Sequence, residues 1–215
     1  MKDWKNQFIK FILKKKILIF GDFILKSNRK SPYFFNMALL STGKDLKKLG
    51  KFYAQALINL NIKFDLLFGV AYKGIPILIA TILALKNYFN LNIPYSFNRK
   101  EIKKYGEKGE TIGHKIQGKI VLIDDIITAG TAIKNTIKII HKNKNSQISN
   151  ILVAIDRKEF GKNKLSAKKE IENKYLCQIS SIIDINDIIL YLKNKNIMKK
   201  KLKTLIRYQE KNCIL

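Results

Sequence analysis

A short apolar strand that ends in two adjacent acids restricts the fold of this chain more than any other feature. Val121–Ile123 is apolar and rich in β-branched residues, which is typical of a buried parallel strand. Asp124 and Asp125 follow directly, and residues 128–131 are small enough to form a tight turn. Apolar residues then recur at helical spacing, at Ile133, Ile137 and Ile140. The segment therefore predicts a strand, a loop and a helix that begins near Thr131.

The loop between this strand and helix has the properties of a phosphate site. Gly130 can adopt a positive φ, and the N-terminus of a helix offers unpaired N–H groups and partial positive charge. Asp124 and Asp125 would disfavour a phosphate alone, but they can accept hydrogen bonds from the hydroxyls of a sugar phosphate. We expect both acids at a surface-facing strand end. The alternative is an ordinary strand–turn–helix with a solvated acidic corner.

Strands and helices alternate from residue 45 to about 195. The apolar pattern predicts strands at 64–70, 93–97, 120–125, 148–155 and 179–185, with helices between them. This order predicts an α/β fold with a mainly parallel central sheet flanked by helices, and ligands at the carboxyl ends of the strands. We expect one domain over residues 1–215, in which a helix and short strands within residues 1–40 form a small N-terminal cap.

The net charge of +26 is compatible with nucleic-acid binding, but the distribution of the charge argues against it. Only four of the 42 basic residues are Arg, and the lysines are spread along the whole chain. Lys, Asn and Ile share A/T-rich codons, so genome composition explains the bias as well as function does. We therefore expect a solvated lysine surface that attracts anionic substrates, and no specific nucleic-acid partner.

Membrane and secreted classes are not favoured either. The longest nearly apolar run, residues 75–85, is too short to cross a bilayer, and the first residues lack the apolar core of a secretory signal. Cys177 and Cys213 are the only cysteines, and they form no recognisable motif. These features predict a cytoplasmic protein without membrane contact and without a disulfide framework.

Two further segments suit anionic groups. Phe68–Gly74 follows a predicted strand and precedes a predicted helix; Gly69 and Gly74 allow a tight backbone, and Lys73 offers charge for a pyrophosphate. Residues 99–115 are polar and glycine-rich, with no apolar period. A loop of this length inside a compact domain is typically a functional lid or disordered. Its separate cations suit a flexible lid that closes over an anionic leaving group.

Two weaker patterns are rejected. Gly113–Lys119 superficially fits a phosphate-binding P-loop, but Ile120 replaces the required Ser or Thr, and the segment precedes a strand instead of following one. His114 and His141 are the only histidines, and they lie far apart without cysteines or acids at ligand spacing. We therefore expect no metal bound by protein ligands alone.

The acid pair and its loop resemble the signature with which type I phosphoribosyltransferases bind phosphoribosyl pyrophosphate (PRPP). The resemblance covers roughly residues 4 to 210 and is specific for the bacterial orotate phosphoribosyltransferase family. The matching segments occur in that family's order and spacing: Lys26, Ser31–Asn36, Ala71–Gly74, Asn98–Glu101, Lys103, the Asp124–Asp125 loop and Asp156–Arg157. The resemblance implies the type I phosphoribosyltransferase fold, with an N-terminal hood and a lid over residues 99–115.

The resemblance also implies roles for individual residues. The PRPP-binding residues would be Lys26, Tyr72, Lys73, Arg99, Lys100, Lys103, Tyr105, Asp124, Asp125, Ile126, Ile127, Thr128, Ala129, Gly130, Thr131 and Ala132. The orotate-binding residues would be Phe34, Phe35, Thr128 and Arg157. The catalytic residues would be Lys103, Asp124 and Asp125. The family often has a histidine where this chain has Tyr105, which can donate to a phosphate but carries no positive charge.

The implied activity is Mg²⁺-dependent transfer of the phosphoribosyl group of PRPP to orotate, in pyrimidine biosynthesis. The Mg²⁺ would be held mainly through the pyrophosphate, and the enzyme would be a homodimer whose lid residues are shared across subunits. Two alternatives stay open: a related transferase for another base, and a PRPP-sensing regulator that binds nucleic acid. The Phe34–Phe35 pair and Arg157 disfavour the first, whereas the pyrophosphate loop and the cationic lid disfavour the second.

Overall fold

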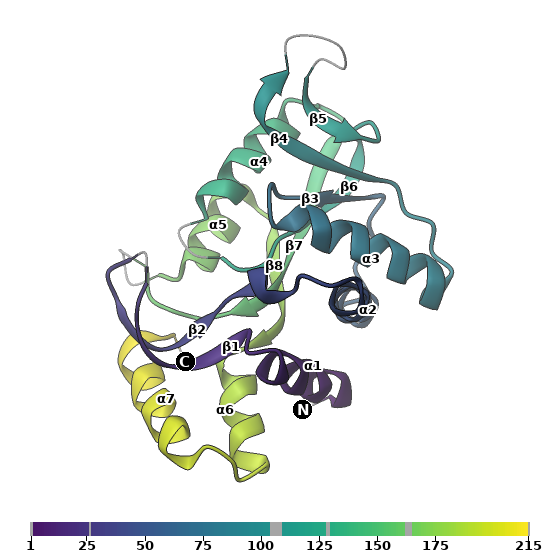
Figure 1. The fold of residues 1–215 in the computed structure, drawn as a ribbon. Coiled ribbons are helices and arrows are strands. Elements are labelled where there is room, and N and C mark those ends of the chain that lie inside the picture. Colours follow the sequence, from purple (N-terminus) through teal and green to yellow (C-terminus); the bar gives the residue numbers. More distant parts are fainter. Residues whose placement is uncertain (1, 26, 104–108, 128–129, 162–164, 215) are drawn as a thin grey trace.

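A six-stranded sheet forms the centre of the computed structural model, which describes residues 2–25, 27–103, 109–127, 130–161 and 165–214 (Figure 1). The strand order is β5-β4-β3-β6-β7-β8. The strands are β3 (Leu66–Gly69), β4 (Tyr95–Lys103), β5 (Gly109–Gly113), β6 (Gly118–Ile123), β7 (Ser146–Asp156) and β8 (Gln178–Asp184). All neighbours are parallel except β4 and β5, which are antiparallel. The predicted α/β fold with a mainly parallel sheet is confirmed.

Helices cover both faces of this sheet (Figure 1). They are α2 (Gly43–Asn59) and α3 (Gly74–Phe89) on one face, and α4 (Thr131–His141) and α5 (Ala167–Tyr175) on the other. Strand β6 shows why both layers are needed. Val121 and Ile123 pack into one apolar cluster, Ile120 and Leu122 pack into a second, and all four are fully buried. Because successive side chains of a strand point to opposite faces, a strand that is apolar throughout requires cover on both sides.

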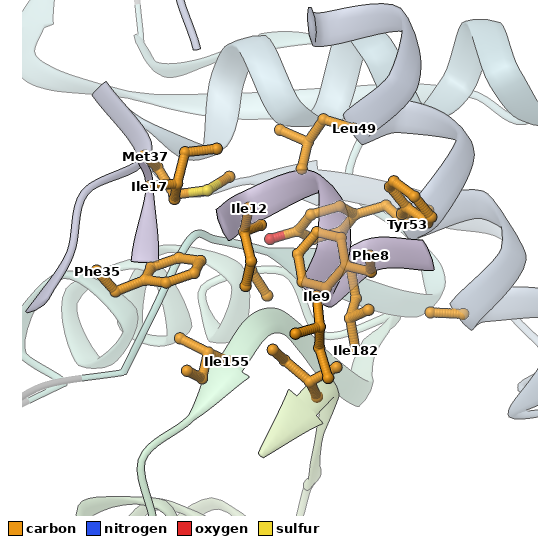
Figure 2. Close-up of a cluster of buried hydrophobic side chains, with 14 of the residues drawn as sticks. Phe8, Ile9, Ile12, Ile17, Phe35, Met37, Leu49, Tyr53, Ile155 and Ile182 are labelled. Atoms are coloured by element: carbon orange, nitrogen blue, oxygen red, sulfur yellow. The ribbon is translucent and has the colours of Figure 1, made fainter. Parts of the chain in front are cut away.

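The N-terminal cap shares its apolar core with the sheet. It consists of α1 (Asp3–Lys14) and the antiparallel pair β1 (Leu18–Ile24) and β2 (Lys30–Phe35). Phe8, Ile9 and Ile12 of α1 belong to the same buried cluster as Tyr53 of α2 and Ile182 of β8 (Figure 2). The C-terminal helices α6 (Ile185–Asn194) and α7 (Lys199–Asn212) lie next to the cap (Figure 1). None of the described helices is both long enough and apolar enough to cross a membrane.

The stretch that the sequence predicts as a lid loop is partly strand. β4 continues to Lys103 and pairs antiparallel with β5, so residues 99–103 belong to one arm of a hairpin and residues 109–113 form the other. The prediction of an irregular loop over 99–115 is therefore wrong for these arms. An antiparallel ladder at a sheet edge is held by backbone hydrogen bonds and needs no apolar period on its exposed faces. Residues 104–108 lie outside the described part of the chain.

The strand order reverses between β3 and β6. From β3 the chain passes outward to β4, whereas from β6 it passes outward in the other direction, to β7 and then β8. Ligands of open parallel sheets bind at the carboxyl ends of the strands at such a reversal. The loops that leave β3 and β6 contain the two segments predicted to bind anions, so the topology places these segments next to each other.

Candidate active site

The loops after β3 and β6 are in contact at the strand reversal. The Val70 N–H donates to the Ile123 carbonyl at 3.0 Å, and Lys73 Nζ lies 2.8 Å from Asp125 Oδ2. Gly74 makes this approach possible, since a Cβ atom at this position would lie 2.4 Å from the Ile123 carbonyl oxygen. The predicted pyrophosphate loop and the acid pair therefore form one site.

The acid pair is fixed through both its backbone and its side chains. Tyr53 Oη donates to the Asp124 carbonyl at 2.8 Å, and the Ala154 N–H donates to the Asp125 carbonyl at 2.9 Å. The Asp125 N–H donates to Asp124 Oδ1, and the Ile126 N–H donates to Asp125 Oδ1, both at 2.9 Å. The two carboxylates are thus pre-oriented at the end of β6.

Both acids are buried, so the expectation of a surface-facing strand end is wrong. Asp124 is 8% exposed and Asp125 is 6% exposed. Burial, followed by the negative charge of Asp125, raises the pKa of Asp124 from 3.8 to about 7. The nearby Lys73 ammonium opposes this rise. A ligand whose hydroxyls donate to these oxygens would stabilise the ionised pair. A sugar has such hydroxyls.

The N-terminus of α4 has the geometry of a phosphate cradle. Gly130 has a φ of 71° and directly precedes Thr131, the first helical residue. None of the described side chains caps this end, and Thr131 and Ala132 are exposed. The unpaired N–H groups of the first turn can therefore bind an anion. Of the other loop residues predicted to bind PRPP, Ile126 and Ile127 are half-buried, whereas Thr128 and Ala129 lie outside the described residues.

Asn98 also belongs to this site, although its sequence context predicts no role for it. Its Oδ1 accepts from the Ala71 N–H at 3.0 Å and from Thr136 Oγ1 at 3.4 Å. Its Nδ2 donates to the Arg99 carbonyl at 3.2 Å. One buried amide thus joins the pyrophosphate loop, helix α4 and the strand that leads into the lid. In the sequence, the only indication of this role is that Asn98 lies in the matching segment Asn98–Glu101. Its hydrogen-bond partners Ala71 and Thr136 are distant in sequence. The Ala71–Tyr72 peptide bond in the loop is cis.

Of the remaining residues predicted to bind PRPP, those that the structure describes lie in the loop after β3 and in the β4–β5 hairpin. Tyr72 is 62% exposed, and Arg99 is half-buried in β4. An ion pair of 2.6 Å between Lys142 and Glu110 joins the residue that follows helix α4 to strand β5. The residues Lys26 and Tyr105 and the side chains of Lys100 and Lys103 lie outside the described part of the protein.

The residues predicted to bind orotate lie on and beside β2. Phe35 is 7% exposed, whereas Phe34 is 36% exposed and stacks near Phe23 with ring centroids 5.5 Å apart. Successive side chains of a strand point to opposite faces, so the two Phe rings lie on opposite faces of β2. This difference could be predicted from their adjacent positions in the sequence. Arg157 directly follows β7 and is 6% exposed, with its guanidinium carbon 3.9 Å from the Tyr33 ring centroid. Contact of these residues with orotate stays a prediction.

The site offers few ligands for a metal. The described residues contain no group of three or more His, Cys, Asp and Glu side chains that could hold an ion. Asp124 and Asp125 provide a carboxylate pair, and Mg²⁺ commonly binds one or two carboxylates together with substrate phosphates and water. These residues therefore fit a Mg²⁺ ion that is held mainly by the pyrophosphate of a substrate.

Known proteins resemble this chain over nearly its whole length. The phosphoribosyl transferase domain family matches residues 38–185. An orotate phosphoribosyltransferase of Buchnera aphidicola subsp. Baizongia pistaciae is 53% identical over 206 residues, which cover 96% of this chain and 100% of the relative. That of Escherichia coli O45:K1 is 50% identical over 210 residues, covering 98% of each. The crystal structure of orotate phosphoribosyltransferase from Francisella tularensis is 38% identical with a TM-score of 0.84, covering 97% of this chain and 100% of that chain. The chain therefore belongs to the phosphoribosyltransferase family, within its orotate phosphoribosyltransferases.

Proposed function

We propose that the protein transfers the phosphoribosyl group of PRPP to orotate, giving orotidine 5′-monophosphate and pyrophosphate in pyrimidine biosynthesis. The observation that carries the proposal is the acid pair Asp124–Asp125, which contacts Lys73 and precedes the N-terminus of α4, an end that none of the described side chains caps. This site offers carboxylates for ribose hydroxyls, amides for the 5′-phosphate and a cation for the pyrophosphate. The names of the relatives support orotate as the accepting base.

The chemistry follows from the charges of the reacting groups. As pyrophosphate leaves C1 of the ribose, negative charge grows on the leaving group and positive charge grows on the sugar. Lys73, Arg99 and Lys103 would stabilise the leaving group, and the acid pair would stabilise the sugar cation and fix the ribose hydroxyls. Bound Mg²⁺ would neutralise further charge on the pyrophosphate. Orotate already carries a negative charge, so the reaction requires no strong general base.

We place the accepting base between the cap and the strand ends. The guanidinium of Arg157 can pair with a carboxylate or carbonyl oxygen of orotate. Phe34 and Phe35 would flank the ring through their side chains and backbone, and Thr128 would add a hydroxyl. Since Phe34 is the more exposed of the two aromatic residues, it is the one that we expect to contribute a ring face.

We propose a homodimer in which each lid serves the neighbouring site. Figure 1 shows the β4–β5 hairpin at the top of the molecule, well away from the β1–β2 pair, which carries predicted orotate contacts. In addition, Leu83 of α3 is 57% exposed and Tyr72 just before this helix is 62% exposed, so the surface formed by α3 and the preceding loop exposes large apolar side chains. A second copy could cover this surface and deliver its own hairpin.

Subunit mixing tests the shared lid. Lys103→Ala and Asp125→Asn should each be nearly inactive alone, because one lacks the lid cation and the other lacks a ribose acceptor. If the lid acts across the dimer, mixed dimers contain one site with both functional residues, and mixing should restore activity. A monomer by analytical ultracentrifugation, or dimers without restored activity, would contradict the proposal.

We also propose that the protein works in the cytoplasm. Cys177 and Cys213 are both buried and unpaired with each other, which suits a reducing compartment. Fractionation of cells that produce the tagged protein would test this location, and recovery from an oxidising compartment would contradict it.

Loss of orotate absorbance in the presence of PRPP and Mg²⁺ is the test of the activity. We expect loss with all three components, and none when PRPP or Mg²⁺ is omitted. A panel of purine and pyrimidine bases separates this activity from that of a related transferase. A nucleic-acid mobility shift that persists at high salt, together with unchanged orotate, would instead favour the PRPP-sensing regulator.

A further inference from the structure

The guanidinium of Arg157 is held in one orientation by contacts on several sides. It stacks on the Tyr33 ring at 3.9 Å, and Nη2 donates to Ser31 Oγ at 2.9 Å. Nε and Nη2 also face Glu159 Oε1, at 2.7 and 2.6 Å. A stacked cation whose donors are paired along one edge cannot rotate without losing several contacts. The contacts made within the described residues thus define which edge of the guanidinium a ligand can approach.

The Glu159 carboxylate is itself fixed by residues that are distant in sequence. Oε1 accepts from Tyr208 Oη of helix α7 at 2.5 Å, and Oε2 lies 3.4 Å from Arg29 Nη1. Arg29 is anchored in turn, since its Nη2 donates to the Phe160 carbonyl at 2.7 Å. Burial, followed by the hydrogen bond to Glu159, raises the pKa of Tyr208 to about 12, so its hydroxyl remains a donor at neutral pH.

The C-terminal segment pairs with the backbone that carries Arg157 and Glu159. The Phe160 N–H donates to the Asn212 carbonyl at 3.0 Å, and the Ile214 N–H donates to the Lys158 carbonyl at 2.8 Å. Cys213 Sγ lies 3.4 Å from the Arg157 carbonyl. The end of the chain therefore supports residues 157–160 through both main-chain and side-chain contacts.

We infer that Glu159 and Tyr208 are positioning residues for the accepting base, and that helix α7 acts on the site through them. The inference rests on the proposed function, in which Arg157 binds orotate. Glu159 occupies the Nε–Nη2 edge of the guanidinium and thereby presents the Nη1 side to the base, while Tyr208 holds the carboxylate in place. Neither residue touches the substrate; each acts through Arg157.

The rival explanation is a purely structural contact that attaches α7 to the cap. Tyr33 and Tyr208 also pack edge to face at 6.0 Å, so the same residues contribute to the core. The two explanations differ in their kinetic signature. A positioning role changes recognition of one substrate, whereas a structural role lowers stability without a substrate preference.

Tyr208→Phe is the decisive variant, because it removes one hydroxyl and keeps the packed ring. We expect the KM for orotate to rise about threefold to tenfold, with the KM for PRPP within twofold of wild type. Glu159→Gln should raise the orotate KM about tenfold or more, because a neutral amide orients the guanidinium less strongly. Tyr191→Phe is the matched control, since Tyr191 is another buried tyrosine of the C-terminal helices, and it should leave both KM values unchanged.

Each outcome supports or overturns the inference. A selective rise in the orotate KM, with a melting temperature that does not account for it, supports the inference. Unchanged orotate KM in Tyr208→Phe and Glu159→Gln overturns it, as do equal rises in the KM values of both substrates. Wild-type protein without activity on orotate would instead contradict the proposed function, so the two failures are distinguishable.

Discussion

Asp124→Asn should stabilise the ligand-free protein while weakening its use of PRPP. The Asp124 carboxyl is buried beside Asp125, and its pKa is raised from 3.8 to about 7. Each unit of pKa corresponds to about 1.4 kcal/mol, so ionising this group in the folded protein costs on the order of 4 kcal/mol relative to the unfolded chain. An Asn side chain has nearly the same shape, can keep the acceptor for the Asp125 N–H, and cannot ionise.

The direction of the pH dependence follows from the raised pKa. Between pH 3.8 and about 7 the folded protein binds a proton at Asp124 that the unfolded chain has released. The contribution of this proton to stability is fully present below pH 3.8 and is lost as the pH rises through 7. The variant and the wild type should therefore be equally stable near pH 4, and the variant should be more stable by on the order of 4 kcal/mol at pH 8.

Urea unfolding of the ligand-free proteins at pH 4, 6 and 8 measures this difference. Asp22→Asn is the control, because it removes the same formal charge from an exposed position on β1. A stability difference between Asp124→Asn and wild type that does not change with pH would refute the reasoning. So would a variant that is less stable than the wild type at pH 8.

The same carboxylate should be required for PRPP. An ionised Asp124 accepts hydrogen bonds from ribose hydroxyls, whereas a protonated carboxyl or an amide offers fewer acceptor sites. The KM of the wild type for PRPP should therefore rise as the pH falls below about 7. Asp124→Asn should have a higher KM that lacks this trend. If the KM for PRPP changed with pH in the same way in both proteins, Asp124 would have no role in PRPP binding.

Three further substitutions test other parts of the site. Gly74→Ala should lower the free energy of unfolding by about 2–3 kcal/mol in urea titrations, because its Cβ would meet the Ile123 carbonyl oxygen at 2.4 Å; Gly43→Ala, whose Cβ meets nothing within 4 Å, is the control. Asn98→Ala should raise the KM for PRPP about tenfold in steady-state assays, and an unchanged KM would contradict its role in holding the pyrophosphate loop. Lys103→Ala should reduce turnover about 10²–10³-fold at saturating substrates, and near-normal turnover would exclude a catalytic lid.

The sequence predicts the central part of the fold well, because the local apolar pattern there agrees with the burial that the folded structure requires. The β-branched run before Asp124 is buried on both faces, and α3 and α4 begin beside the glycines that the pattern singles out. Strand order follows from physical rules only in part. The alternation of elements favours a mainly parallel sheet, but it does not determine that the strand order reverses between β3 and β6.

The lid hairpin could not be predicted from its composition. Strand β5 pairs with residues 96–98 of β4 and again at Lys103, across an irregularity between Asn98 and Lys103, and no apolar period reports such pairing at an exposed edge. For the acid pair, the sequence predicts exposure where the structure shows burial. Adjacent aspartates are usually solvated, so their burial at a strand end is a tertiary effect, produced by packing against Tyr53, Ala154 and the loop that carries Lys73.

The two halves of the site differ in how the fold supports them, and this difference explains which errors sequence reasoning makes. Asp124 is held against an electrostatic penalty, so a neutral residue there should raise stability and reduce function. Arg157 is held by stacking and by paired charges, so its removal should lower both, because the half-buried Glu159 carboxylate would lose one of the two cations that it contacts among the described residues. The residues of the first arrangement follow one another in one loop and are visible as a motif, although their burial depends on Tyr53, Ala154 and the Lys73 loop. The second joins residues 29, 31, 33, 157, 159 and 208, and only the folded chain brings them together.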